Sequence, residues 1–468
     1  MTVIARTLTL ALLIPLCLGP GCATYALYTT DLREQLAITD YDGFLTSLSR
    51  ARKGPNQLLY LMEKGLVERY RGDYRQSNDA FDRAERLSDR LFTRSLSREV
   101  ASLVTHDAVR DYRGDPHELV FIHYYRALNY WQLGQPEDAL VECRKANLRL
   151  SRLTGLDSTA ARNDAFIHYV TGLFYEAAGE LNDALVSYRN AAAAYRAYER
   201  TFGVSPPPGL AVDLARVAWL QGDSEGHPPA AGDLHPPAGQ GELVLFCETG
   251  FVPRKTQVEI NLPLYEAELK GRGPEDAMSL SRQIVRRYRG GGPNLPDRLV
   301  TSRTPFFRPP DLRVKYWLRV ALPACPESAQ QTRTLRLSAS GIQAGTEVAE
   351  DLSAIARSTF DHQYPAVMLR TVARGVSKYL ASEAVDRKNK VLGFFANLFA
   401  ASTEAADTRS WVSLPHTVQI GRLRLPAGAQ RVTVEALDNR GGVVDRAVLD
   451  GVEIRAGERP CLSWRTYK

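Results

Sequence analysis

The chain has 468 residues, which is too long for one ordinary domain and predicts two or three. Apolar residues make up 44% and charged residues 24% of the chain, a balance that excludes a disordered or fibrous protein. The net charge of +6 arises from 59 basic and 53 acidic residues, too small a bias for the footprint of a nucleic-acid-binding protein. We therefore expect folded domains and no nucleic-acid partner.

Residues 1–21 have the pattern of a signal peptide. A single basic residue is followed by an apolar stretch from Leu8 to Leu18 and then by small residues up to Cys22. The stretch is too short for a stable membrane span, and no other stretch approaches the roughly 18 to 20 apolar residues that a transmembrane helix needs. We expect export followed by cleavage.

The residues around the expected cleavage site resemble the end of the lipobox of bacterial lipoproteins. Cys22 stands between Gly21 and Ala23, although Gly19 occupies the position where leucine is usual. We predict that Cys22 is lipidated and that residues 22–56 form a tether with a lead-in helix. Ala23 in place of aspartate resembles the outer-membrane pattern of Gram-negative sorting. Cleavage after Ala23, which would leave a soluble periplasmic protein, is the alternative.

Residues 57–220 contain an internal repeat. FIHYYRALNYWQLGQPEDALVECRKA, from Phe121, aligns with FIHYVTGLFYEAAGELNDALVSYRNA, from Phe166, and each copy predicts two antiparallel helices joined at Gly134 or Gly179. A third copy turns at Gly72. These positions resemble the tetratricopeptide repeat (TPR), and three copies reach the usual minimum for a stable stack.

The repeats are interrupted. Their turn glycines are 62 and 45 residues apart, where tandem copies would be about 34 apart. The segments Ser88–Pro116 and Ser151–Arg162 are therefore insertions, and the first is long enough for an extra helix. A last helix over Pro208–Leu220 is expected to cap the array.

Candidate partner-binding residues lie on and beside the repeats. Aromatic side chains exposed in a groove would be binding hot spots, although a further helix or the C-terminal domain would cover them equally well. Charged residues of the first insertion would either bind a partner or cap a helix. The candidates are Phe121, Tyr124, Trp131, Phe166 and Tyr169 in the repeats, with Arg113 and Asp115 in the insertion.

The remainder predicts a linker and an α+β domain. Residues 221–241 are rich in proline and glycine and predict the linker. Residues 242–468 predict helices between Asp351 and Ala400 and antiparallel strands from Thr417 onward. Earlier strands are expected at Glu242–Cys247, Thr256–Leu262, Lys315–Leu322 and Thr334–Ser338. The fold class is thus multidomain, an all-α repeat array followed by an α+β domain, and we expect residues 29–220 to fold independently.

Two segments of the second half allow two interpretations each. Arg282, Arg286, Arg287 and Arg289 would contact an anionic lipid or polyanion, or simply form a solvated helix end. The apolar residues around Phe394 would form a core helix, or bind a bilayer surface or a partner.

The sequence lacks the motifs of catalysis and cofactor binding. No GxxxxGK[ST], HExxH, GxSxG or dinucleotide motif occurs in the required context, so we expect no enzyme activity and no cofactor. His123 and His168 occupy the same place in two repeats, but further ligands for a metal are not evident. The widely spaced Cys143, Cys247, Cys325 and Cys461 allow three disulfide pairings, and Cys143 fits a small buried residue better.

Two longer segments carry a family resemblance. SREVASLVTHDAVRDYRGDPHELVFIHYYRALNYWQLGQPEDALVECRKAN, from Ser97 to Asn147, and ADTRSWVSLP, from Ala406 to Pro415, resemble an uncharacterised family of proteobacterial TPR outer-membrane lipoproteins. The resemblance implies a place at the periplasmic face of the outer membrane and a setting in envelope assembly.

These observations together predict a non-catalytic scaffold or adaptor in outer-membrane or peptidoglycan assembly. Its partner would be another envelope protein, and the sequence does not fix the oligomeric state. The alternative from another class is an envelope hydrolase with its site around Asp407, Arg409 and His416.

Overall fold

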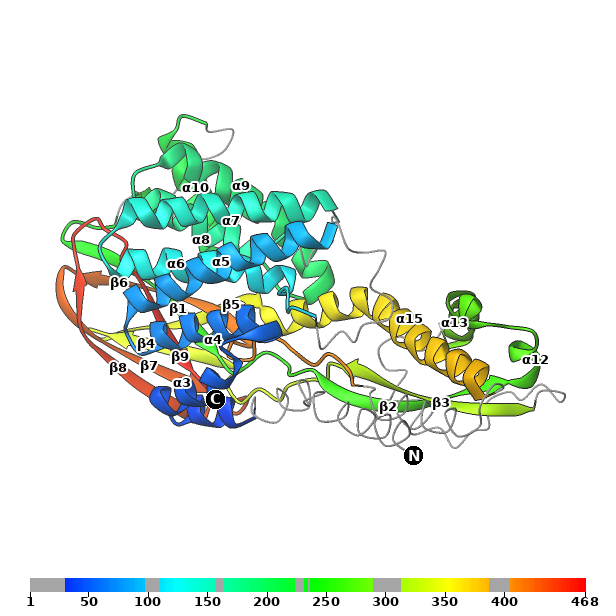
Figure 1. Cartoon of the computed structure of the whole chain (residues 1–468). Coiled ribbons are helices and arrows are strands. Elements are labelled where there is room, and N and C mark those ends of the chain that lie inside the picture. The colour runs from blue at the N-terminus through cyan, green and yellow to red at the C-terminus, as the bar shows by residue number, and fades with distance from the viewer. Residues whose placement is uncertain are drawn as a thin grey trace.

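The computed structural model describes residues 30–96, 110–156, 163–223, 231–234, 236–288, 313–386 and 405–468. Its N-terminal half is helical, and its C-terminal half is rich in strands. Figure 1 shows the helices stacked against a curved sheet, with a long arm extending from this body. Cys22 with the expected signal peptide, Arg289 and the Phe394 segment lie outside the described residues.

The helical half consists of three helix pairs and a capping helix, as the repeat predicts. Short helices precede it: an α-helix over residues 30–37, α3 (Tyr41–Leu48), and the 3-10 helices η1 (Ser49–Ala51) and η2 (Gly54–Asn56). The array is α4 (Gln57–Tyr70), α5 (Tyr74–Leu96), α6 (Pro116–Gln132), α7 (Pro136–Leu156), α8 (Ala165–Ala177), α9 (Leu181–Phe202) and α10 (Pro208–Leu220). The predicted helical-repeat half, with its paired helices and capping helix, is confirmed.

Glycine makes both the turns and the close helix contacts of the array. Gly72, Gly134 and Gly179 end the first helix of each pair with φ of 89°, 69° and 83°, a left-handed conformation that favours glycine. Within the third pair, a Cβ at Gly172 would lie 2.4 Å from the ring of Tyr188. Two tight packing requirements therefore explain why the repeat is visible in sequence.

Much of the inserted sequence lengthens the second helices. α5 continues to Leu96 and α7 to Leu156, so both run well past the length that pairing with the first helix requires. Residues 97–109 and 157–162, which complete the insertions, lie outside the described residues.

The main sheet has seven strands in the order β8-β7-β4-β5-β6-β1-β9. They are β1 (Gln240–Thr249), β4 (Thr334–Ala339), β5 (Ile342–Asp351), β6 (Thr417–Pro426), β7 (Gly428–Leu437), β8 (Val443–Ile454) and β9 (Cys461–Thr466). The sheet is mixed, which corrects the expectation of antiparallel strands alone: β1 pairs with β6 antiparallel and with the C-terminal β9 parallel. β1 also begins at Gln240, inside the expected linker, where α11 (Ala231–Leu234) lies as well.

The arm has its own core. It is built from β2 (Thr256–Tyr265), α12 (Glu266–Leu269), η6 (Pro274–Asp276), α13 (Ala277–Tyr288), β3 (Val314–Ala324) and α15 (Leu352–Asp386). β2 and β3 form a two-stranded antiparallel sheet, and α15 runs along it away from the body (Figure 1). α15 packs closely there, since a Cβ at Gly375 would lie 2.9 Å from Leu318. Of the expected arginine cluster, Arg282 and Arg286 are exposed on α13, whereas Arg287 pairs with Glu268.

The array and the main sheet share a hydrophobic core. Phe246 on β1 is fully buried, and its ring lies 6.2 Å from that of Phe166 and 6.4 Å from that of Tyr124. Trp411, which follows the arm, is also fully buried and lies 5.9 Å from Phe81 in the first helix pair. Because the repeats bury their inner face against the sheet, we no longer expect residues 29–220 to fold alone.

Within the described ranges, no helix combines the length and the apolarity that crossing a bilayer requires.

Candidate functional site

The inner face of the array is filled by the chain itself. Phe121, Phe166 and Tyr169 are fully buried and Tyr124 is 3% exposed, so none of them faces an open groove. Trp131 is half-buried at the rim, with its ring 5.0 Å from that of Phe174. The structure therefore follows the second of the two sequence interpretations, in which the C-terminal domain covers the aromatic residues. We do not propose the four buried residues as partner contacts.

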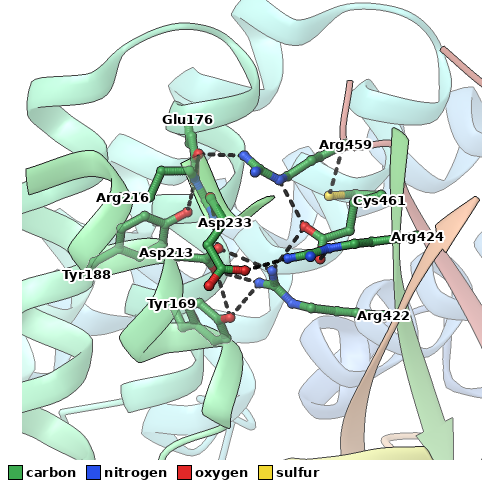
Figure 2. Close-up of polar contacts among 11 residues, drawn as sticks. Tyr169, Glu176, Tyr188, Asp213, Arg216, Asp233, Arg422, Arg424, Arg459 and Cys461 are labelled. Atoms are coloured by element: carbon green, nitrogen blue, oxygen red, sulfur yellow. Dashed lines mark hydrogen bonds and ion pairs between the residues drawn. The ribbon is translucent and has the colours of Figure 1, made fainter. Parts of the chain in front are cut away.

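A network of charged residues fastens the sheet to the array beside these rings (Figure 2). Arg216 on α10 donates to both carboxylate oxygens of Glu176 on α8, at 2.8 Å each. Arg459, just before β9, donates to Glu176 at 2.8 Å and to Glu242 on β1 at 2.9 Å. Glu176 on a helix thus shares Arg459, which lies 283 residues later in the chain, with Glu242 on a strand.

Asp213 is the centre of this network. It is fully buried on α10 and accepts hydrogen bonds from Arg216, Arg422 and the Tyr169 hydroxyl. Arg422 on β6 also donates to the Tyr169 oxygen at 2.7 Å. Burial opposes charge on Asp213, but the two guanidinium groups outweigh it and lower its pKa. Tyr169 is therefore a structural residue of the interface between helices and sheet.

An open cleft lies where the array meets the arm. This junction cleft has a volume of about 360 Å³ and is lined by the loop at 110–115, the residue before β2, the end of β3, the middle of α15 and the segment after the arm. The loop and the segment after the arm belong to the two stretches that carry the family resemblance. Residues almost 300 positions apart are thus brought together at one surface.

Arg409 joins the two stretches. It donates to the Arg110 carbonyl at 2.9 Å and to Asn56 Oδ1 at 3.2 Å, and its guanidinium lies 5.4 Å from the centre of the Tyr112 ring. It also forms an ion pair with Asp407 at 2.7 Å. Arg409 is only 3% exposed, so it supports the wall of the cleft.

Two buried carboxyl groups hold the segment after Arg409. Glu118 on α6 accepts from the Trp411 backbone N–H at 2.7 Å and from the Tyr112 hydroxyl at 2.6 Å. Glu63 on α4 accepts from the Val412 N–H at 2.8 Å. Burial raises the pKa of both Glu118 and Glu63 to about 7. These groups anchor the cleft from beneath and are not open to solvent.

Some charged groups at the mouth of the cleft already form ion pairs, and others do not. Asp115 accepts from Lys255 at 2.9 Å, and although burial opposes its charge, Lys255 holds its pKa below the usual range. Arg113 and Arg370 are exposed, and neither forms a hydrogen bond or ion pair with a described residue. The cleft thus presents two guanidinium groups that are available for an incoming anion.

Two residues of this site were predicted from the sequence. Arg113 and Asp115 were candidates because they lie in an insertion next to a repeat helix, and the cleft contains both. Asp115 also has the local role considered for it, since its backbone N–H donates to Glu118 at 2.9 Å at the start of α6. Lys255 and Arg370 belong to no motif, and only the tertiary fold brings them to the loop.

The residues considered for a hydrolase site, a metal site or disulfides make other contacts in the structure. Asp407 and Arg409 pair with each other, whereas His416 lies 2.7 Å from the Ser353 hydroxyl on α15. His168 contacts Asn163 at 3.1 Å and is not joined to His123. The four cysteines form no disulfide, and Cys143 is buried.

Three potential metal ligands do cluster in the array. Donor atoms of Glu85, His123 and Glu142 lie within 4.8 Å of one another. Arg126 and Lys145 already form ion pairs with both carboxylates. The cluster is therefore a charge-balanced network between α5, α6 and α7, whose two cations oppose binding of a metal ion.

Comparison with known proteins gives only distant similarities. No protein-family model matches the chain, and no curated protein matches it. Among solved structures, MamA from Desulfovibrio magneticus is 17% identical with a TM-score of 0.26 and covers 43% of this chain and 86% of its own. YrrB, described as a TPR protein with an unusual peptide-binding site, is 14% identical, with coverage of 42% and 78% and a TM-score of 0.26. The apo form of RapI is 14% identical, with coverage of 42% and 64% and a TM-score of 0.30. Similarity at this level does not establish a function for this chain.

Proposed function

We propose that this chain is a non-catalytic interaction protein of the bacterial cell envelope that binds an acidic segment of a partner protein in the junction cleft. The observation that carries the proposal is a pair of exposed arginines that line the cleft, Arg113 and Arg370, neither of which pairs with a described residue. A guanidinium group pairs well with carboxylates through two parallel hydrogen bonds.

The remaining geometry supports this choice of surface. The array cannot use its inner face for a partner while Phe246 and the sheet fill it. The cleft is instead supported from beneath by Arg409 and Glu118, so its shape does not depend on a partner being present. A site that is preformed avoids much of the entropic cost of ordering on binding.

A binding role is also better supported than hydrolysis. The hydrolase alternative needs Asp407, Arg409 and His416 around one substrate, but Asp407 is paired to Arg409, and His416 is paired to Ser353, which is 1% exposed. Catalytic groups must reach the atoms that react.

The cleft is tested by substituting Arg113 and Arg370 one at a time. We expect that R113A and R370A each weaken capture of the partner from solubilised membranes by roughly 30-fold, about 2 kcal/mol, because each removes a charged anchor. The partner is read out by mass spectrometry of material bound to the tagged full chain. Since both side chains are exposed, thermal unfolding should be unchanged.

R431A is the matched control for these variants. Arg431 on β7 is also exposed, forms an ion pair with Asp450 on β8, and does not line the cleft. Its removal should leave capture intact. Capture that is insensitive to R113A and R370A, or equally sensitive to R431A, would mean that the partner binds elsewhere.

We further propose that Cys22 carries the lipid that holds the protein at the periplasmic face of the outer membrane. The support is the sequence pattern of residues 1–23, with the small residues that precede the cysteine. Metabolic labelling with a palmitate analogue should mark the wild type and not C22S, and C22S should leave the membrane fraction. Equal labelling of both proteins would exclude acylation at Cys22.

A further inference from the structure

The first helices of the chain and the two-stranded sheet of the arm lie on the same side of the molecule, at the bottom of Figure 1. Each carries a largely exposed apolar side chain. Ile38, in the turn between the first helix and α3, is 73% exposed, and Trp317 on β3 is 58% exposed. Exposed apolar residues that are scattered singly are normal. The surroundings of these two residues therefore decide whether they belong to a contact surface.

Trp317 lies on the face of the arm's sheet that points away from the helices. Side chains alternate between the two faces of a strand. Leu318 and Val320 belong to the core that β2 and β3 form with α13 and α15, which places Trp317 on the other face. Directly opposite it on β2 is Pro263, which carries no charge. The indole ring is thus presented outward beside another apolar residue.

The charged neighbours of Trp317 already have partners. Lys315 and Arg319, two residues before and after it on β3, form ion pairs with Glu383 and Glu259. An incoming anion would have to compete with these carboxylates. A partner of this face therefore gains mainly from apolar contact.

The chain enters the body beside the base of the arm. Thr30 is the first described residue, and its hydroxyl accepts from Arg254, two residues before β2. Thr30 also lines a cavity together with residues 326–329, which directly follow the end region of β3. Ile38 is one short helix away from this entry point, about 12 Å. Trp317 is about 24 Å further along the sheet from the first residue of β2.

The acylation proposed for Cys22 limits how far this entry point can lie from a membrane. Eight residues, 22–29, separate the lipid-bearing end from Thr30. A fully extended chain spans at most about 3.6 Å per residue, so Thr30 lies within about 29 Å of that end. A body held this closely turns the side that contains the base of the arm toward the bilayer. This limit rests on the lipid proposed above.

We propose that this side of the molecule lies on the membrane, with Trp317 and Ile38 inserted into the phospholipid interface. Tryptophan suits the interface because its ring is apolar and its N–H group can still donate a hydrogen bond. Isoleucine gains free energy by leaving water. Because Lys315 and Arg319 are already paired, the contact does not depend on anionic lipid. It goes beyond the proposed function, since it fixes the orientation of the body as well as its attachment.

Bromine on lipid acyl chains quenches tryptophan fluorescence at short range and therefore reports insertion. The test uses the mature chain, residues 22–468, attached through an N-terminal hexahistidine tag to phosphatidylcholine vesicles that contain nickel-chelating lipid. We expect lower fluorescence on vesicles with brominated acyl chains than on unbrominated ones. W317F should remove at least half of this difference. W219F, at an exposed position on α10 at the opposite side of the molecule, should keep it (Figure 1).

Ile38 is tested in the W317F protein by a gain of signal. I38W should restore quenching by the brominated lipid, and L148W, at a 52% exposed position on α7, should not. No quenching of the vesicle-bound protein, quenching that W317F leaves intact, or a signal from L148W that matches that of I38W would each overturn the proposal. The nickel-chelating lipid holds the protein whether or not Cys22 is acylated in cells. Failure here is therefore distinct from failure of the palmitate labelling, which tests the anchor itself.

Discussion

R422A is expected to lower the free energy of unfolding by about 3 kcal/mol or more, because it leaves a buried carboxylate short of its partner. Asp213 is fully buried and is shared by Arg216 and Arg422. Removing Arg422 also takes a hydrogen-bond donor from the Tyr169 oxygen. Urea denaturation followed by circular dichroism measures the change.

R431A is again the control, because its ion pair with Asp450 joins two exposed side chains, with 74% and 63% of their surface accessible. Pairs of this kind contribute about 0–1 kcal/mol. We expect one cooperative transition in both variants, since the array and the sheet share a core. If R422A unfolded like R431A, the network in Figure 2 would not be what fastens the sheet to the helices.

A pair of buried carboxyl groups makes the same interface sensitive to pH. Glu350 on β5 is fully buried, and its neighbour Asp164 precedes α8 and accepts from the Ile167 N–H at 2.8 Å. Burial, followed by the negative charge of Asp164, raises the pKa of Glu350 well above its usual value. Burial also raises the pKa of Asp164 to about 6. A protonated pair is thus stable here, and a doubly charged pair is not.

E350Q should therefore become more stable than the wild type as the pH rises. The folded-state pKa of Glu350 lies above its unfolded value, so the stability that its protonated form contributes is complete below about pH 4 and is lost as the pH rises through the folded-state pKa. Because Asp164 is present in both proteins, the difference reports Glu350, and we expect the wild type to lose stability relative to E350Q as the pH rises from 4 to 8.

Denaturation at a series of pH values measures this difference, and the other titrating groups cancel because both proteins contain them. S340A, at an exposed turn beside the same strand, should show no dependence on pH relative to the wild type. A wild type that gained stability over E350Q with rising pH would show that the pair is ionised in the folded protein.

The sequence predicted the array well because its signals are local. Gly72, Gly134 and Gly179 sit at left-handed turns, and Gly172 sits where Tyr188 leaves no room for a side chain. The turn and the close helix contact each involve residues of one helix pair only. The residue types that they require therefore recur with the repeat. Strand β5, with the sequence IQAGTEVAED, was missed because several of its side chains are small or charged and much of it is exposed.

Long-range contacts explain what the sequence could not predict. An aromatic residue such as Tyr124 has the same pattern in the sequence whether it faces solvent or Phe246, which lies more than 120 residues later. The parallel pairing of β1 with β9 depends on the last strand of the chain returning to the first. Arg113 was found from its place in an insertion, but nothing local marks Arg370 as another residue of the same cleft.

Photo-crosslinking tests the central claim, that the partner binds the junction cleft and not the repeat groove. Benzoylphenylalanine is placed at position 113 or 370 in the cleft, at 131 on the rim of the array, or at 186 on the exposed side of α9, one position at a time. Our account predicts that the same partner protein is captured from positions 113 and 370 and not from 131 or 186. Capture from position 131 or 186, with none from 113 and 370, would contradict it.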